Sequence, residues 1–216
     1  MITLKNISFN YPGDPFILNI PSLEIMSGKS VSVYGPSGSG KSTLLKLIAG
    51  EISLYAGDIS INNRSISNLS ENELRKIRMS SFGIVSQKPN LIKWMTVKDN
   101  ILLVPGLSFS KVNLVERLDC LTEALEIQSL LHKNAGEIST GEQFRASIAR
   151  ALIGSPEIVL ADEPTSSLDE KLREKTLQLI IDECKKSNTT LVIVSHQSHE
   201  IECTDSKLSS IDWNLV

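Results

Sequence analysis

The chain has 216 residues and a formal net charge of −3, with 41% hydrophobic and 22% charged residues. This length favours a single domain with a sizeable core, and the composition is that of an ordinary globular protein. The small negative charge gives no general attraction to nucleic acid or anionic lipid. No apolar run reaches the roughly 18 residues of a membrane span, and three cysteines without metal-ligand spacing favour a reducing compartment over a disulfide framework.

The first part of the chain is predicted to be rich in β-strands. Residues 2–9 and 17–26 have strand-like composition, and the turn-forming residues 11–15 separate them. Another strand is expected at 58–61, after Gly57.

A glycine-rich loop joins a predicted strand, 30–34, to a predicted helix, 42–49. It fits G-x-x-x-x-G-K-[ST] in the context that this motif requires. Its glycines let backbone N–H groups point at phosphate oxygens, while Lys41 can reach the β- and γ-phosphates and Ser42 can bind Mg²⁺. The pattern predicts a nucleoside triphosphate site formed by Gly35, Pro36, Ser37, Gly38, Ser39, Gly40, Lys41, Ser42 and Thr43.

The middle of the chain begins with a short predicted helix. Ser70 and Glu73 fit a capping box that opens a helix to about Arg78. A short apolar strand, 82–86, follows and ends at Gln87.

A long helical pattern is expected over residues 96–132. Its leucines recur four, three and four residues apart on one face, at Leu114, Leu118, Leu121 and Leu125. This stripe extends over too few heptads for a coiled coil, which favours a role in the core over an interaction zipper.

The remainder of the chain alternates between the two kinds of element. Helices are predicted near 141–153 and at 170–186, and strands at 158–162 and 190–195. Such alternation implies a parallel sheet with helices on both faces.

Polar residues follow the last two predicted strands, at the edge where open α/β sheets place ligands. Asp162 is suited to a Mg²⁺ shell, and Glu163 to polarising a water molecule for attack on the γ-phosphate. His196 ends the next strand. A lone histidine there is often structural, but its place in a phosphate-loop core favours contact with the γ-phosphate.

Residues 137–145, with the helical run 148–152 and the acidic strand after them, resemble the signature sequence L-S-G-G-Q/E of ABC transporter nucleotide-binding subunits. By order and spacing, Gln87 resembles the Q-loop glutamine, Asp169 the D-loop aspartate and His196 the switch histidine. Tyr11 lies where the family's aromatic residue stacks on adenine, although it could instead pack against its own turn.

The resemblance implies an α/β fold of the P-loop NTPase type, with a RecA-like core around a parallel sheet, an N-terminal antiparallel β subdomain and an inserted α-helical subdomain. We expect one ABC ATPase domain over 1–216, with the core at 1–87 and 155–216 and the helical subdomain at about 88–154.

It also implies ATP hydrolysis with Mg²⁺. The expected catalytic residues are Glu163, His196, Gln87 and Lys41, and the expected metal ligands are Ser42, Gln87 and Asp162. Beyond the phosphate loop, the nucleotide contacts would come from Tyr11, Ser139, Gly141 and Asp169. A GTPase would need the guanine-reading sequence Asn-Lys-x-Asp, which does not occur.

The expected partners are a second copy of the chain and an integral membrane permease subunit, with no nucleic acid. The ATP would lie between the phosphate loop of one copy and the signature of the other in a head-to-tail dimer. The chain would then work at the cytoplasmic face of the membrane, held there by the permease.

The signature also fits a second capping box, formed by Ser139 and Glu142. We expect the nucleotide-free subunit to use this cap and the γ-phosphate from the other subunit to compete for Ser139. Thr140 replaces the family's usual first glycine, which a helical N1 position tolerates.

Residues 69–78 and 82–87, together with 160–165, are similar to the lipoprotein-releasing, macrolide-exporting and cell-division group of these ATPases. A generic importer or exporter ATPase is the alternative. Residues 88–100 are predicted to bind the membrane subunit, because Trp94 and its neighbours put apolar side chains on a loop. The other interpretation of Trp94 is a place in the core.

Overall fold

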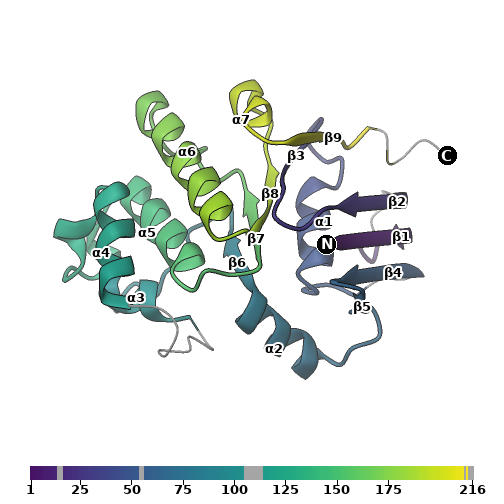
Figure 1. The fold of residues 1–216 in the computed structure, drawn as a ribbon, viewed down its shortest axis with the longest axis horizontal. Helices are drawn as coiled ribbons and strands as arrows, with labels where there is room; N and C mark the ends of the chain where they lie inside the picture. Colours follow the sequence, from purple (N-terminus) through teal and green to yellow (C-terminus); the bar gives the residue numbers. More distant parts are fainter. Residues whose placement is uncertain (14–16, 54–55, 105–113, 212, 214–216) are drawn as a thin grey trace.

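The computed structural model describes residues 1–13, 17–53, 56–104, 114–211 and 213, without the side chains of 198 and 199. They form two sheets and the helices that pack on them (Figure 1). The smaller sheet is antiparallel, in the order β2-β1-β4-β5, and consists of β2 (Leu18–Ile25), β1 (Ile2–Phe9), β4 (Ala56–Ile61) and β5 (Arg64–Ser65).

The larger sheet is parallel, in the order β6-β7-β8-β3-β9. Its strands are β6 (Phe82–Val85), β7 (Ile158–Asp162), β8 (Thr190–Val194), β3 (Ser30–Tyr34) and β9 (Ser206–Ser209). Because β3, β7 and β8 run side by side in one direction, their carboxyl ends meet at one edge. The fold therefore brings the phosphate loop together with the polar residues that follow β7 and β8.

Each face of the parallel sheet has its own apolar core, as the alternation along β8 shows. Val192 and Val194 belong to the core that also contains α1 (Lys41–Ile48) and the antiparallel sheet. Leu191 and Ile193 belong to the core of the opposite face. Helix α1 thus lies between the two sheets (Figure 1), and the predicted α/β class with helices on both faces is confirmed.

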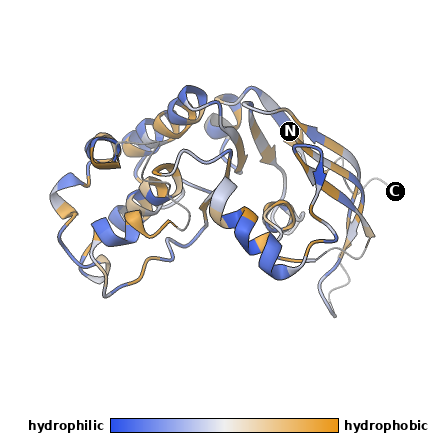
Figure 2. Ribbon diagram, turned by 60° about the horizontal axis from the view of Figure 1, so that its bottom comes forward, coloured by the Kyte–Doolittle hydropathy of each residue, from blue (hydrophilic) through white to orange (hydrophobic). Residues whose placement is uncertain are grey.

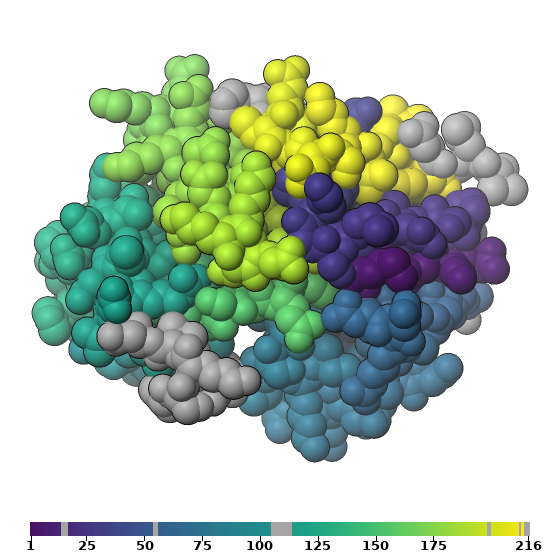
Figure 3. All heavy atoms as spheres, viewed as in Figure 1, coloured from purple at the N-terminus to yellow at the C-terminus, as the bar shows by residue number. Residues whose placement is uncertain are grey.

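The opposite face is covered by helices that are apolar on one side only, which gives them their mixed colours in Figure 2. They are α3 (Val97–Leu102), α4 (Leu114–Ala124), α5 (Thr140–Leu152) and α6 (Glu170–Lys186). One continuous core joins α4 and α5 to β7 and β8. The predicted helical subdomain, about 88–154, therefore shares a core with the parallel sheet, and its boundaries stay a prediction. In Figure 3 this helical region and the N-terminal strands lie at opposite ends of the molecule.

Most predicted elements match the structure to within a residue or two. Strand β7 and helix α6 have the predicted bounds, and α2 (Glu71–Ser81) opens with the predicted capping box of Ser70 and Glu73. Among the described residues, none of the helices is both long and apolar enough to cross a membrane.

The segment 96–132, predicted to be helical, is divided into separate helices rather than continuous. Described parts of that run form α3, α4 and a short 3₁₀ turn, η1 (Gln128–Leu130), and 105–113 lie outside the described residues. Its leucine stripe does lie in the core, where Leu118, Leu121 and Leu125 are buried. Strand β5, helix α7 (Ser198–Glu202), strand β9 and a second 3₁₀ turn, η2 (Ala135–Glu137), were not predicted.

Candidate ATP site

The phosphate loop links the end of β3 to the start of α1. Three of its glycines have the positive φ that favours glycine: +146° at Gly35, +80° at Gly38 and +88° at Gly40. Gly40 is the N-cap of α1, and no side chain caps this helix. The positive end of the α1 dipole thus faces the loop, as an anion site requires.

Lys41 is folded over its own loop. Its Nζ donates hydrogen bonds to the carbonyl oxygens of Gly35, at 2.9 Å, and Pro36, at 2.7 Å, and the residue is only 9% exposed. A buried ammonium group that has only neutral carbonyl partners still attracts an anion strongly. The loop therefore holds a fixed positive charge where phosphate oxygens would bind.

A cavity of about 340 Å³ lies above the loop. Tyr11 stands at its rim, 36% exposed, with its ring 4.9 Å from that of Phe9 in an edge-to-face contact. The phenol is thus held in place beside the phosphate loop and presents surface on which a base could stack. The cavity is lined by Tyr11, Ser37, Gly38, Gly40, Lys41, Ser42, Thr43, Glu163 and Val194.

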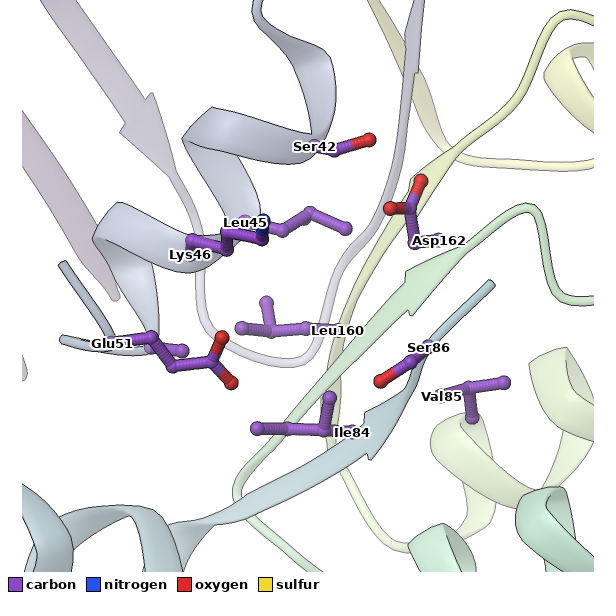
Figure 4. A pocket seen from close by; sticks show the side chains of 10 residues that line it. Ser42, Leu45, Lys46, Glu51, Ile84, Val85, Ser86, Leu160 and Asp162 are labelled. Carbon is purple, nitrogen blue, oxygen red and sulfur yellow. The ribbon is translucent and has the colours of Figure 1, made fainter. Parts of the chain in front are cut away.

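Asp162 ends β7 opposite the start of α1, and Figure 4 shows its carboxylate facing the hydroxyl of Ser42. Burial raises the pKa of Asp162, and the Ser42 hydroxyl together with Lys46 and Lys41 only partly offsets this effect. A partly buried carboxylate that lacks a strong counter-charge, with a hydroxyl beside it, is a fitting pair of oxygen donors for Mg²⁺. Within the described part of the chain, no group of three or more acidic, cysteine or histidine side chains forms a further metal site.

Gln87 does not line the cavity that Ser42 and Asp162 share. A second cavity, of about 80 Å³, is lined by Ser42, Asp162 and Ser86, among others. Gln87 follows Ser86 and is exposed. The structure therefore brings Ser42 and Asp162 together and leaves Gln87 at the surface beside them.

Glu163 is held in an unusual backbone conformation. Its φ is +50°, a left-handed value that costs energy for a residue other than glycine. Its N–H donates to the Val194 carbonyl at 2.9 Å, and its own carbonyl accepts from the Ser166 N–H at 3.2 Å. The backbone is thus fixed from both sides, which directs the carboxylate into the cavity above the phosphate loop.

His196 and Glu163 meet directly. The histidine Nδ1 lies 3.1 Å from the Glu163 Oε1. The two residues were each predicted from their position after a strand, but their contact was not. The signal was available, because residues that follow neighbouring parallel strands at the same edge come together.

The signature segment lies apart from this cavity, since none of the lining residues comes from α5. Ser139 is the N-cap of α5 and forms the predicted capping box with Glu142. The Glu142 Oε2 accepts from the Ser139 N–H and from the Ser139 hydroxyl, both at 2.7 Å. These hydrogen bonds lower the pKa of Glu142.

Asp169, predicted to contact nucleotide, is the N-cap of α6. Its Oδ1 accepts from the Leu172 N–H at 3.1 Å, and it does not line the cavity. Sequence reasoning missed Ser210, which lies beneath the phosphate loop. The hydroxyls of Ser210 and Ser39 are 2.5 Å apart, and no pattern in the polar C-terminal segment indicated this contact.

Comparisons with known proteins agree with this geometry. Residues 18–166 match the family model described as ABC transporter. An uncharacterized ABC transporter ATP-binding protein of Methanocaldococcus jannaschii is 37% identical over 91% of this chain and 87% of its own length. The lipoprotein-releasing system ATP-binding protein LolD of Bacteroides fragilis is 32% identical over the full length of both.

Solved structures are similar as well. A dimeric bacterial ABC transporter cassette superposes with a TM-score of 0.86 at 33% identity, covering 97% of this chain and 95% of the other. A cassette dimer in a post-hydrolysis state, bound to ADP and Pi, gives 0.85 at 34% identity with the same coverage. The chain therefore belongs to the ABC transporter family, as an ATP-binding subunit that hydrolyses ATP.

Proposed function

We propose that this chain is the motor subunit of an ABC transporter and that two copies enclose ATP head to tail. The observation that carries the proposal is the separation of the two anion-binding elements. The phosphate loop and Glu163 line one cavity, whereas Ser139 and Gly141 do not contribute to it. A second copy, arranged as a dimer of the kind solved for relatives, would supply a signature helix to each cavity.

The residues of the cavity suggest how hydrolysis proceeds. Loop N–H groups and Lys41 bind the phosphates, and the ammonium exchanges its two carbonyl partners for phosphate oxygens. Mg²⁺ held by Ser42 and Asp162, with Gln87 nearby, would neutralise charge on the β- and γ-phosphates. Glu163 orients a water molecule and accepts its proton, while His196 fixes the Glu163 carboxylate and stands beside the transferred phosphate.

Replacement of Glu163 by glutamine tests this proposal. Glu163→Gln keeps the shape of the side chain but cannot accept a proton, so ATP hydrolysis should fall by roughly 10²–10⁴-fold. ATP affinity should persist, and size-exclusion chromatography with light scattering should detect a dimer that forms only with ATP. Glu170→Gln, at an exposed position of α6, is the control. It should neither lower ATP hydrolysis nor accumulate as an ATP-dependent dimer. A Glu163→Gln variant that stays monomeric in ATP would contradict the dimer.

We also propose that the surface around residues 88–100 binds a membrane subunit. Trp94 is 82% exposed, so the interpretation that it packs in the core was wrong. The loop that carries it is rigid, because the buried Asn100 side chain accepts from the Ile92 N–H at 2.7 Å and donates to the Ile92 carbonyl at 3.0 Å. A rigid loop with an exposed tryptophan is typical of an interface anchor.

A groove of about 330 Å³ is lined by residues of α2, β6 and α5 and of the segment that follows α3, and it includes Asn90 from the same loop. It combines apolar side chains with arginines, a composition that suits a protein partner. Its lining consists of Arg75, Arg78, Met79, Phe82, Gly83, Ile84, Ser86, Asn90, Leu103, Val104, Arg150 and Ala151. We expect the cytoplasmic segment of the membrane subunit to bind here, which would place the ATPase at the cytoplasmic face of the membrane.

For the type of transporter we propose the lipoprotein-releasing or macrolide-exporting kind. Several relatives at 32–35% identity are LolD proteins, including one of Rickettsia bellii that shares 35% over 96% of this chain. An importer or exporter of another kind, or a cell-division complex, is the alternative. A methionine import ATP-binding protein of Clostridioides difficile is 34% identical, although this chain covers 63% of its length.

Co-purification with the membrane subunit tests the partner surface. Trp94→Ala should reduce recovery of the complex while the isolated subunit keeps its ATPase activity, because the side chain lies outside the cavity. Val115→Ala, also a large exposed apolar residue at 70% but on α4, is the matched control. Equal recovery of both variants would contradict the proposed surface.

A further inference from the structure

One carboxylate outside the ATP cavity is almost completely buried. Glu200, in α7, is 1% exposed. Its Oε2 has no hydrogen-bond partner among the described residues. Burying a carboxylate costs free energy that its contacts must offset, so such a group calls for a role that an apolar side chain could not fill.

The other carboxylate oxygen binds the turn that carries Glu163. The Thr165 hydroxyl, in a residue with no exposed surface, donates to the Glu200 Oε1. Thr165 is two residues beyond Glu163, and its carbonyl accepts from the Leu168 N–H at 3.0 Å. The same turn is closed by the Ser166 N–H and hydroxyl, both of which donate to the Glu163 carbonyl. Moving Thr165 would therefore move Glu163.

Glu200 is also fixed to the segment that carries His196. Its carbonyl accepts from the Ser32 hydroxyl at 3.2 Å, which attaches α7 to β3. The Ile201 N–H donates to the Gln197 carbonyl at 3.2 Å. This bond forms a helical turn that links Glu200 to the residue next to His196. The carboxylate thus reaches from the segment after β8 to the turn after β7.

We propose that Glu200 is a positioning residue that, through Thr165, holds the side chains of Glu163 and His196 in their relative positions. The two segments are then joined twice: at the cavity by the contact of 3.1 Å between His196 and Glu163, and beneath it by Thr165 and Glu200. The inference rests on the roles proposed above for Glu163 and His196.

A directional bond fits this task better than apolar packing. The φ of +50° at Glu163 is a strained conformation that persists only when its surroundings fix it. A hydroxyl that donates to a carboxylate is a charge-assisted hydrogen bond with a defined geometry. Two apolar side chains of the same size would fill the space without fixing the angle between the two segments.

The double variant Thr165→Val/Glu200→Met separates positioning from stability. It removes both polar groups together, so no buried partner is left unsatisfied and the melting temperature should stay close to that of the wild type. The kcat for ATP hydrolysis should nevertheless fall by roughly ten- to a hundredfold, because the reacting groups lose their alignment. The KM for ATP should not change, since neither residue lines the cavity.

Two comparisons complete the experiment. Thr165→Ser keeps the hydroxyl and should retain most of the wild-type kcat, whereas Thr165→Val should show a reduced kcat. This pair tests the proposal even if the double variant fails to fold. Thr122→Val removes a buried hydroxyl from α4, which donates to the Leu118 carbonyl at 2.8 Å, and should leave kcat unchanged.

A wild-type kcat in the double variant, or equal kcat in Thr165→Val and Thr165→Ser, would overturn the proposal. This failure is distinct from failure of the proposed catalytic roles, which would appear as normal hydrolysis by Glu163→Gln.

Discussion

Gly35 of the phosphate loop and Gly141 of the proposed signature differ in how far the fold of this chain requires a glycine. At Gly35 the φ is +146° and a Cβ would lie 2.0 Å from the Ser210 hydroxyl oxygen, so the fold of this chain itself excludes a side chain. At Gly141 a Cβ would lie 3.6 Å from the Leu168 Cδ2, an ordinary contact. The chain alone therefore requires the first glycine and gives no reason for the second.

The N-termini of α1, at the phosphate loop, and of α5, at the signature, also differ in whether a side chain caps them. No side chain caps α1, which leaves its positive end to the phosphate loop. Helix α5 is instead capped by Ser139 and Glu142, so its N-terminus is satisfied within the chain. The phosphate loop is therefore built as an anion site within one subunit. In the proposed dimer, the signature would become one only if a ligand from the other subunit displaced its cap.

Among the variants that test this difference between the phosphate loop and the signature, Ser139→Ala should have the largest effect on ATP hydrolysis. Loss of a donor to the γ-phosphate should reduce hydrolysis by roughly a hundredfold, while ATP affinity of the monomer stays the same. Ser70→Ala is the matched control, because Ser70 and Glu73 form the same capping box on α2. Both variants should lose about 1 kcal/mol of stability, and only Ser139→Ala should lose turnover. If Ser139→Ala and Ser70→Ala show equal turnover in steady-state assays, Ser139 is not part of the site.

The two glycines themselves provide the second test. Gly35→Ala should strain the phosphate loop by about 1–3 kcal/mol and weaken ATP binding, measured by calorimetry. Gly141→Ala should leave ATP affinity intact and raise the stability of the monomer by up to about 1 kcal/mol, because alanine favours a helix. Its hydrolysis should fall, since a partner's nucleotide loses its close approach. Wild-type hydrolysis by Gly141→Ala would show that no nucleotide from a second subunit packs against this residue.

Tyr11→Ala probes the part of the cavity that one subunit supplies alone. Loss of stacking on the base should weaken ATP binding by roughly 1–2 kcal/mol. GTP binding should weaken by a similar factor, because stacking distinguishes the two bases poorly. If a folded Tyr11→Ala variant binds ATP as the wild type does, the tyrosine serves only its contact with Phe9.

The smallest effect is expected at Thr140. Thr140→Gly restores the glycine that is usual in the family and should cost at most about 1 kcal/mol of stability at an exposed helix end. Turnover should stay the same or rise, because a side chain leaves a crowded interface. Loss of turnover would mean that the threonine makes a specific contact across the dimer.

The sequence predicted those parts of the fold in which local signals and tertiary packing agree. Strand β7 is a continuous apolar run ending in acidic residues, and both β7 and α6 have their predicted bounds. The capping boxes at Ser70 and Ser139 were also correct, because these motifs satisfy backbone groups locally.

Elements that depend on distant partners were missed. Strand β9 is short and polar, and it exists because its backbone pairs with β3 at the edge of the parallel sheet. Helix α7 has five residues and no side-chain cap. For the same reason the contacts of Ser210 with Ser39 and of Glu200 with Thr165 could not be predicted, since each joins residues at least 35 positions apart.

A mixing experiment tests the head-to-tail arrangement most directly. Lys41→Ala removes the charge of the phosphate loop, Ser139→Ala removes the signature hydroxyl, and each variant alone should be nearly inactive. In a head-to-tail mixed dimer one site contains both defects and the other contains neither. Equal mixing should therefore restore ATP hydrolysis to about a quarter of the wild-type rate, because half of the dimers are mixed and each has one intact site. If the mixture is no more active than its two components, the head-to-tail arrangement is wrong, because Ser139 would then serve its own chain.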